Sequence, residues 1–170
     1  MSFSGTQTLI QFKNEWIPEL FSWINNQREL VLWSGNTFAG ENFTHQSIHQ
    51  HLQQNDISPY AILDDNKSLL AYGEIVRRKK EGRLILCRVI IHPLYRGKGF
   101  GKIFCRLLLE KCLTYGGYNN VRLNVIRNNW PAVSCYSSLG FKKIGVFPKA
   151  RKLGGIELDL LIMSKPLTNV

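Results

Sequence analysis

The feature that most constrains this sequence is the stretch from Val89 to Lys102, where a buried strand, a Pro-marked exit, a Gly-rich loop and a helix start follow one another. Glycines at alternate positions let backbone N–H groups converge without obstruction by Cβ atoms. At a helix N-terminus such a loop forms a nest for an anion, and flanking cations strengthen it. The stretch therefore predicts a pyrophosphate-binding site. Its glycines are Gly97, Gly99 and Gly101, and its cations are Arg96, Lys98 and Lys102.

Two better-known phosphate loops do not fit this stretch. A P-loop requires a hydroxyl residue after its Gly-Lys pair, but Gly101-Lys102 is followed by Ile103. A dinucleotide-binding loop has the spacing G-x-G-x-x-G and an acidic residue about twenty positions later. Here the spacing is G-x-G-x-G, and the segment Val121 to Leu123 offers no acid. Both classes of nucleotide site are excluded.

The chain reads as one domain, residues 1–170, with 44% hydrophobic content and neither repeats nor low-complexity linkers. Strand-like and helix-like segments alternate, which predicts an α/β fold with a mixed sheet and helices on its faces. Thr6–Phe12, Tyr60–Leu63, Leu69–Arg77, Leu84–Ile91, Val121–Ile126, Lys142–Phe147 and Ile156–Ser164 are the predicted strands. The predicted helices are one capped by Asn14, then Gln27–Trp33, His45–Gln53 after the cap Thr44, Gly99–Thr114 and Trp130–Leu139.

Two motifs give the chain a family resemblance. Arg96-x-x-Gly99-x-Gly101, placed after a strand that ends in Ile-His-Pro, resembles the acetyl-CoA motif of the GNAT superfamily of N-acetyltransferases, Q/R-x-x-G-x-G/A. Downstream, the segment Asn129 to Phe141 resembles that family's N-x-x-A-x-x-x-Y followed by L-G-F. The resemblance covers about Pro59 to Met163. It implies a GNAT fold (α/β, also described as α+β) with about seven strands and about four helices.

The resemblance also implies which residues contact acetyl-CoA, the expected cosubstrate. The backbone of the strand would pair with the pantetheine arm, the loop would hold the pyrophosphate, and Asn129 would lie beside the thioester. Tyr136 would stand near the CoA sulfur. The strand residues are Val89, Ile90 and Ile91, and the loop residues beside Arg96 are Gly97, Lys98, Gly99, Phe100, Gly101 and Lys102.

Acetyl transfer needs a proton donor for the thiolate, a donor to the carbonyl oxygen and a deprotonated amine. Tyr136 is the candidate acid, and a core tyrosine packed under Leu139 and Phe141 is the alternative. A backbone N–H near Ile90 or Ile91 would meet the carbonyl oxygen if the strand bulges there. Glu74 is the candidate base, and a solvent-facing residue or a cross-strand partner of Arg88 is equally compatible with its position.

The formal net charge is +10 and the pI about 9.7, which suits a polyanionic partner and mildly disfavours polycationic acceptors such as polyamines. The densest basic block, Arg77 to Lys80, predicts a solvated hairpin tip. No aromatic residue stands beside it, so nucleic acid is an unlikely partner. We expect an N-acetyltransferase whose acceptor is a protein N-terminal amine or a small-molecule amine, attacked directly in a ternary complex. The alternatives are a CoA-sensing module without turnover and a basic nucleic-acid-binding module.

The remaining signals predict a cytoplasmic protein without a metal. The N-terminus lacks the pattern of a secretory signal, and no apolar run is long enough to span a membrane. Four scattered cysteines suggest reduced, buried thiols, and His45 with His49 has no third ligand, so no zinc site is expected. The strand Ile156–Ser164 could pair with a second subunit, which leaves a homodimer as an option.

Overall fold

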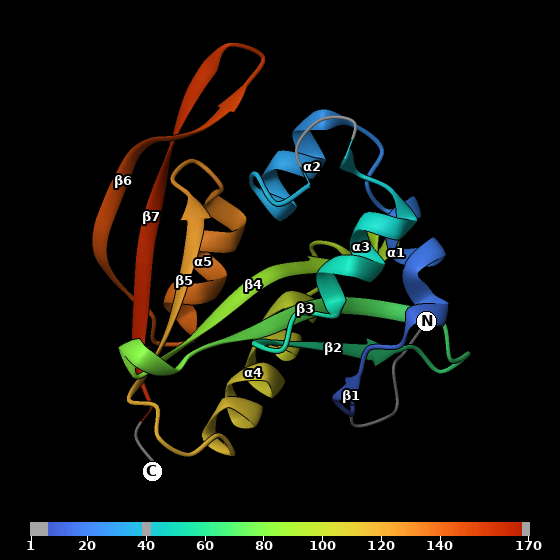
Figure 1. Cartoon of the computed structure of the whole chain (residues 1–170), viewed down its shortest axis with the longest axis horizontal. Helices are drawn as coiled ribbons and strands as arrows, with labels where there is room; N and C mark the ends of the chain where they lie inside the picture. The colour runs from blue at the N-terminus through green and yellow to red at the C-terminus, as the bar shows by residue number, and fades with distance from the viewer. Residues whose placement is uncertain (1–6, 39–41, 168–170) are drawn as a thin grey trace.

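The computed structural model describes residues 7–38 and 42–167, and in these residues one seven-stranded sheet is flanked by five α-helices (Figure 1). The strands are β1 (Ile10–Gln11), β2 (Ile57–Leu63), β3 (Leu69–Arg78), β4 (Arg83–Ile91), β5 (Asn120–Ile126), β6 (Lys142–Leu153) and β7 (Ile156–Pro166). The helices are α1 (Ile17–Ser22), α2 (Gln27–Ser34), α3 (His45–Leu52), α4 (Phe100–Leu113) and α5 (Trp130–Ser138), and the 3-10 turns are η1 (Asn14–Trp16), η3 (Lys79–Glu81) and η4 (Pro93–Tyr95).

Most predicted elements are present. Strand β6 continues to Leu153, beyond the predicted end at Phe147, and β2 begins at Ile57. The other differences lie near the N-terminus. Asn14 does not cap a helix. It begins the turn η1, whose N-cap Lys13 makes no side-chain capping bond, and α1 follows with Pro18 in its first turn. Of the predicted strand Thr6–Phe12, only Ile10–Gln11 is a strand, and Thr6 lies outside the described residues. Thr44 caps α3 as predicted, in a capping box with Ser47.

Alternating side chains of the sheet supply two hydrophobic cores. Along β2, Tyr60 and Ile62 belong to the core under α4, whereas Ala61 belongs to the core under α1, α2 and α3. This period of two places opposite faces of the sheet against different helices. The residues of β3 from Leu69 to Val76 are buried, because helices cover both of its faces.

The sheet opens between β4 and β5, where the functional residues gather. These neighbours are parallel and pair only over Arg83–Ile85, so the rest of β4 has no partner strand on that side. On its other side β4 pairs with β3, but the register shifts opposite the segment between Tyr72 and Glu74. The register shift lies beside Arg88, whose φ of 50° is in the left-handed region. A bulged strand with one open edge results.

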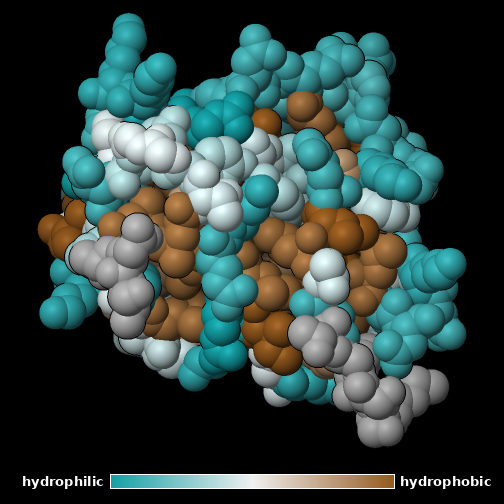
Figure 2. Space-filling view, turned by 90° about the horizontal axis from the view of Figure 1, so that it is seen from below, coloured by the Kyte–Doolittle hydropathy of each residue, from teal (hydrophilic) through white to brown (hydrophobic). Residues whose placement is uncertain are grey.

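The C-terminal hairpin closes the sheet in the strand order β1-β2-β3-β4-β5-β7-β6. From Leu160 onward β7 is paired on both edges, with β5 and with β6, so this part of Ile156–Ser164 has no free edge for the pairing with another subunit that the sequence allowed. From the side opposite the hairpin tip, Figure 2 shows a hydrophobic patch that hydrophilic side chains border and cross. Within the described residues, no helix is both long and apolar enough to cross a bilayer.

Candidate active site

A cavity of about 750 Å³ lies at the open edge of β4, between the N-terminus of α4, helix α5 and helix α2. It brings together residues that are far apart in the sequence, including Tyr136 of α5 and the loop before α4. The predicted residues that line it are Val89, Ile90, Ile91, Arg96, Gly97, Gly99, Gly101, Lys102, Asn129 and Tyr136.

Three predicted residues do not line this cavity. Lys98 is exposed, with its ammonium 5.5 Å from the centre of the Tyr95 ring. Phe100 is buried in the core under α4, so only its backbone could serve a ligand of the loop. Glu74 is fully buried elsewhere, as described below.

The loop before α4 has the backbone shape of an anion nest. Gly97 and Gly99 adopt φ values of 74° and 86°, which side chains disfavour, and a Cβ built on either would meet no protein atom within 4 Å. Gly99 is the N-cap of α4, so the first N–H groups of this helix point toward the open space. Lys102 adds a cation at the cavity wall. The loop therefore fits a pyrophosphate.

Arg96 and Glu29 join the loop to helix α2. The Arg96 guanidinium donates to the carbonyl oxygens of Ile91 at 3.1 Å and Trp23 at 3.4 Å, and it lies 3.3 Å from the Glu29 carboxylate. A hydrogen bond from the Asn25 backbone lowers the pKa of Glu29, and Arg96 adds to this against the opposing effect of burial. Arg96 thus holds the cavity wall together, and Glu29 is a lining residue that the sequence reasoning missed.

The bulge in β4 is fixed by a tryptophan from α2. The Trp33 indole donates to the carbonyl oxygen of Arg88 at 2.7 Å, directly at the bulge. Trp33 lines the cavity, as does Val89, the residue that follows Arg88 in the strand. The bulge that the carbonyl-binding hypothesis required is therefore present in β4.

Helix α5 places Tyr136 and Asn129 at the inner end of the cavity. Asn129 is the N-cap of α5, and its side chain accepts from the Ala132 N–H at 3.4 Å. The Tyr136 ring packs against Phe141 at 6.0 Å, edge to face. Burial raises the pKa of the Tyr136 phenol well above its ordinary value, so it stays protonated at neutral pH.

A second cavity, of about 190 Å³, meets the first at Tyr136 and Asn129. It lies between helix α2 with its C-terminal turn, the diverging ends of β4 and β5, and the β6–β7 hairpin. Its polar lining includes Thr37, Arg88 and Arg151. Tyr136 thus lines both cavities, one of which extends to the phosphate loop and the other to the hairpin.

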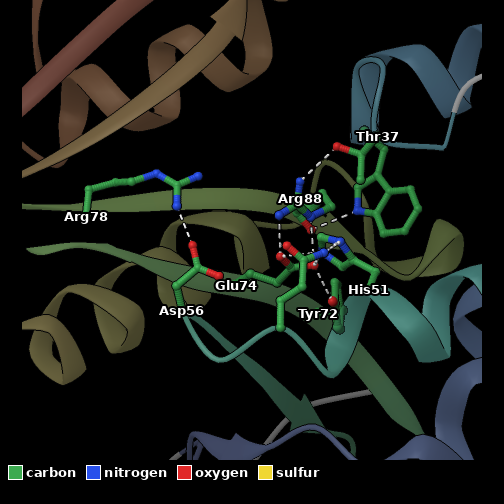
Figure 3. Close-up of polar contacts among 9 residues, drawn as sticks. Thr37, His51, Asp56, Tyr72, Glu74, Arg78 and Arg88 are labelled. Carbon is green, nitrogen blue, oxygen red and sulfur yellow. Dashed lines mark hydrogen bonds and ion pairs between the residues drawn. The ribbon is translucent and has the colours of Figure 1, made fainter.

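Glu74 takes part in a buried ion pair and not in either cavity, contrary to the expectation that it faces the cleft. Its carboxylate accepts from Arg88 Nε at 2.7 Å and from Tyr72 at 2.5 Å, and it lies 3.1 Å from His51 Nε2 (Figure 3). Arg88 Nη1 points the other way and donates to the Thr37 hydroxyl at 3.2 Å. Glu74 is therefore a cross-strand partner of Arg88, the alternative role that its position in the sequence allowed.

His51 and Tyr72 are the partners of Glu74 that the sequence did not indicate. His51 lies on α3 and is 8% exposed, and its ring packs on Phe38 at 5.2 Å. Burial acts to raise the pKa of Glu74, but hydrogen bonds from His51 and Arg88 outweigh burial and leave the pKa lowered. Glu74 is therefore a buried carboxylate anion that holds Arg88.

Two of the four cysteines face the large cavity. Cys105 of α4 and Cys135 of α5 both line it, and a hydrogen bond joins their thiols. That hydrogen bond lowers the pKa of Cys135 to about 7 against the effect of burial. In the part of the chain that the structure describes, no group of three or more His, Cys, Asp or Glu side chains is placed to hold a metal ion.

Comparison with known proteins agrees with this geometry. The model of the acetyltransferase (GNAT) family matches residues 17–141. Spermidine N(1)-acetyltransferase of Vibrio cholerae is 24% identical over 123 residues, 72% of this chain and 71% of that protein. An uncharacterised protein of Mycobacterium leprae is 33% identical over 73 residues, 43% of this chain and 19% of that protein.

The fold has close counterparts among solved structures. The crystal structure of spermidine N-acetyltransferase from Vibrio cholerae in complex with CoA and spermine has a TM-score of 0.81 to this chain, with 20% sequence identity and 95% of each chain covered. At this level of identity the likeness concerns the fold.

Proposed function

We propose that this chain, which belongs to the acetyltransferase (GNAT) family and is an acetyl-CoA-dependent N-acetyltransferase, acetylates the amino group of a small molecule. The amine attacks acetyl-CoA directly in a ternary complex. The observation that carries the proposal is the meeting of two cavities at Tyr136. One suits acetyl-CoA and the other a small acceptor. The relatives named above as spermidine acetyltransferases also support a small-molecule amine.

We propose that the chain binds acetyl-CoA through backbone groups more than through side chains. The open edge of β4, from Val89 to Ile91, offers peptide groups to the pantetheine arm because β5 has diverged there. The loop of Gly97 and Gly99 offers N–H groups to the pyrophosphate. Acetyl-CoA supplies the activated acetyl group, and the acceptor amine attacks its carbonyl carbon.

Tyr136 acts in this proposal as the general acid. As the carbon–sulfur bond breaks, its phenol gives a proton to the leaving sulfur, and the raised pKa keeps that proton available. The CoA thiol has an ordinary pKa of about 8.5, below that of a phenol, so the phenol assists by sharing its proton with the sulfur as negative charge develops there. The proton released by the amine, carried by solvent, restores the phenol. Asn129 orients α5 through its capping bond and lies beside the same space.

The carbonyl oxygen gains negative charge during attack, and the bulged segment of β4 is the proposed donor to it. Peptide N–H groups at a bulge are released from the strand ladder and can point at a ligand. Trp33, bonded to the Arg88 carbonyl, fixes that segment. The proton lost by the amine leaves to solvent, since Glu74 is enclosed by its own partners and is better suited to position Arg88.

The substitution Tyr136→Phe tests the assignment of the acid. We expect kcat to fall by about a hundredfold, the lower range for general acid catalysis, while the dissociation constant of acetyl-CoA changes less than about twofold because no cofactor-binding group is removed. CoA release measured with a thiol reagent and calorimetric binding of acetyl-CoA report the two quantities. Full activity in the variant would show that Tyr136 is not the acid.

The same assay separates the enzyme from a CoA-sensing module. Binding of acetyl-CoA without CoA release over a broad panel of amines and peptides would contradict acetyl transfer. For the nucleic-acid alternative, the basic block offers little, because Arg78 is paired with Asp56 and Arg77 donates to Ser58 at 2.6 Å. Peptide acceptors in the panel test the remaining alternative of a protein N-terminal amine.

A further inference from the structure

We infer that the acceptor is an amine that also carries an anionic group, which Arg151 and Arg88 hold in the second cavity. This inference rests on the proposed function and names its substrate class. Both cations line the second cavity, and no Asp or Glu does so within residues 7–38 and 42–167. A polyamine would bring further positive charge into a cavity that already holds arginines.

Arg151 reaches this position because strand β6 bends. The register between β6 and β7 shifts between Phe147 and Arg151, and the Lys149 N–H donates to the Asp159 carboxylate at 3.0 Å within the bend. The Arg151 side chain then lies against Gly35 at the end of α2, with its Nε 2.6 Å from where a Cβ of Gly35 would be. A side chain at position 35 would displace the guanidinium from this place.

The charge of Arg151 is not neutralised by a described neighbour. Its Nη1 donates to the Ala150 carbonyl oxygen at 2.8 Å, and none of the ion pairs formed among the described side chains includes it. A guanidinium offers several donors in one plane, a geometry that suits a carboxylate or a phosphate. Arg151 therefore presents an unneutralised cation to the cavity.

Arg88 contributes a second donor from the opposite wall. Glu74 occupies two of its nitrogens, and Nη1 is left beside the Thr37 hydroxyl at the lining of the cavity. The Arg88 side chain is 11% exposed, and its orientation is fixed by the buried pair. A rigid donor on β4 and an unneutralised cation on β6 together form an anion subsite near Tyr136.

The same charges assist the chemistry of the amine. A nearby cation disfavours the protonated ammonium form, so it lowers the pKa of a bound amine. When the anionic group of an acceptor binds Arg151, this attraction offsets the electrostatic cost of bringing an amine into a basic cavity. A polyamine lacks that compensation.

Steady-state CoA release with matched amines tests this inference. The pairs are glycine with glycinamide, β-alanine with 3-aminopropanamide, and O-phosphoethanolamine with ethanolamine, with spermidine as the polyamine. The carboxylate and phosphate arms distinguish the two kinds of anion. We expect kcat/KM for at least one anionic amine to exceed that of its neutral twin and of spermidine by tenfold or more at equal ionic strength.

The variant Arg151→Gln makes the test specific. We expect the anionic preference to fall by about ten- to a hundredfold, the effect of one charge-assisted hydrogen bond, mainly through KM. Lys152→Gln removes a neighbouring exposed charge and should retain the preference. Comparing one pair of amines across the variants cancels their different amine pKa values. A preference for spermidine or the neutral twins, or one unchanged in Arg151→Gln, would overturn the inference and leave acetyl transfer intact.

A binding measurement keeps the two proposals separable. If no amine causes CoA release, the proposal of acetyl transfer is refuted. Calorimetry on the CoA-loaded protein with the same anionic amines then tests separately whether the anion subsite exists. Binding that Arg151→Gln abolishes and Lys152→Gln retains would support it. Equal or absent binding in wild type and Arg151→Gln would refute it.

Discussion

Gly97 and Gly99 illustrate how single residues shape the proposed cofactor site. Both have positive φ, and no protein atom lies within 4 Å of the position that a Cβ would occupy on either residue. In a residue with a side chain, the left-handed conformation costs free energy, and the Cβ would extend into the region proposed for the pyrophosphate. These two effects act on different measurable quantities, namely stability and cofactor affinity.

Gly99→Val and Gly117→Val separate the two effects. Gly117 lies just beyond the other end of α4, with φ of 83° and nothing within 4 Å of a built Cβ, but it does not line the cavity. We expect both variants to lose about 1–2 kcal/mol of unfolding free energy. Only Gly99→Val should weaken acetyl-CoA binding, by more than tenfold in calorimetry. Equal affinities in the two variants would argue against a pyrophosphate at this loop.

The residues of this loop were predictable because their role is local. The spacing of the glycines and the following helix determine where the N–H groups point. The orientation of Glu74 was not predictable in the same way. Strand β3 is covered on both faces, so alternation along it does not distinguish a cleft from a core. The bulge opposite Gly73 is held by a contact from a distant part of the sequence, the hydrogen bond from Trp33 to Arg88.

The contact between helices α4 and α5 creates a thiol pair with unequal acidities. The hydrogen bond from Cys105 lowers the pKa of Cys135 to about 7, and burial raises the pKa of Cys87 and Cys112 to about 11 and about 12. Because the thiolate is the reactive form, only Cys135 should react quickly near neutral pH. Cys87 and Cys112 serve as internal references for slow reaction.

We therefore expect iodoacetamide to alkylate Cys135 first, with a rate that rises with pH and reaches half its maximum near pH 7. Saturating acetyl-CoA should slow this reaction by tenfold or more, because Cys135 lines the cavity. In Cys105→Ala the half-maximum should move toward the ordinary thiol value of 9. Mass spectrometry of digested protein measures each site. Alkylation unaffected by acetyl-CoA would place the cosubstrate elsewhere.

Element boundaries followed from the sequence where a local signal sets them. Thr44 caps α3, and Gly99 begins α4, since capping depends on neighbouring residues. The order of the strands in the sheet was harder to predict from the sequence. The position of β7 between β5 and β6 depends on how the C-terminal hairpin docks, and the sequence did not indicate that β5 would occupy the edge of β7 from Leu160 onward. The second cavity results from that docking, and both cavities lie where β4 and β5 diverge.

At the scale of the whole molecule, the network around Glu74 joins parts that fold from distant sequence. His51 comes from α3, Tyr72 and Glu74 from β3, and Arg88 from the bulge of β4 (Figure 3). A buried carboxylate requires such partners, because an uncompensated charge inside a protein is costly. The network thus couples helix α3 to β4, the strand proposed to hold the thioester.

Replacing Glu74 by Gln should destabilise the protein by about 3 kcal/mol, because Arg88 loses its partner in a largely buried position. For a domain of this size that is a decrease in Tm of roughly 10 °C. Glu157→Gln is the matched control. It removes a carboxylate from the exposed pair with Lys149, for which about 0–1 kcal/mol is typical.

The pH dependence of this difference distinguishes a charged Glu74 from a neutral one. Since the folded protein lowers the pKa of Glu74, the charged form stabilises the fold fully above the ordinary value of 4.5. The advantage of wild type over Glu74→Gln should therefore be constant near neutral pH and shrink as pH falls below 4.5 through the lowered pKa. Thermal or urea unfolding of both proteins between pH 3 and 7, measured by circular dichroism, gives this difference directly. An advantage that instead grew on acidification would mean that the buried carboxyl is protonated in the folded state, and Arg88 would then lack the anion that holds it toward the acceptor cavity.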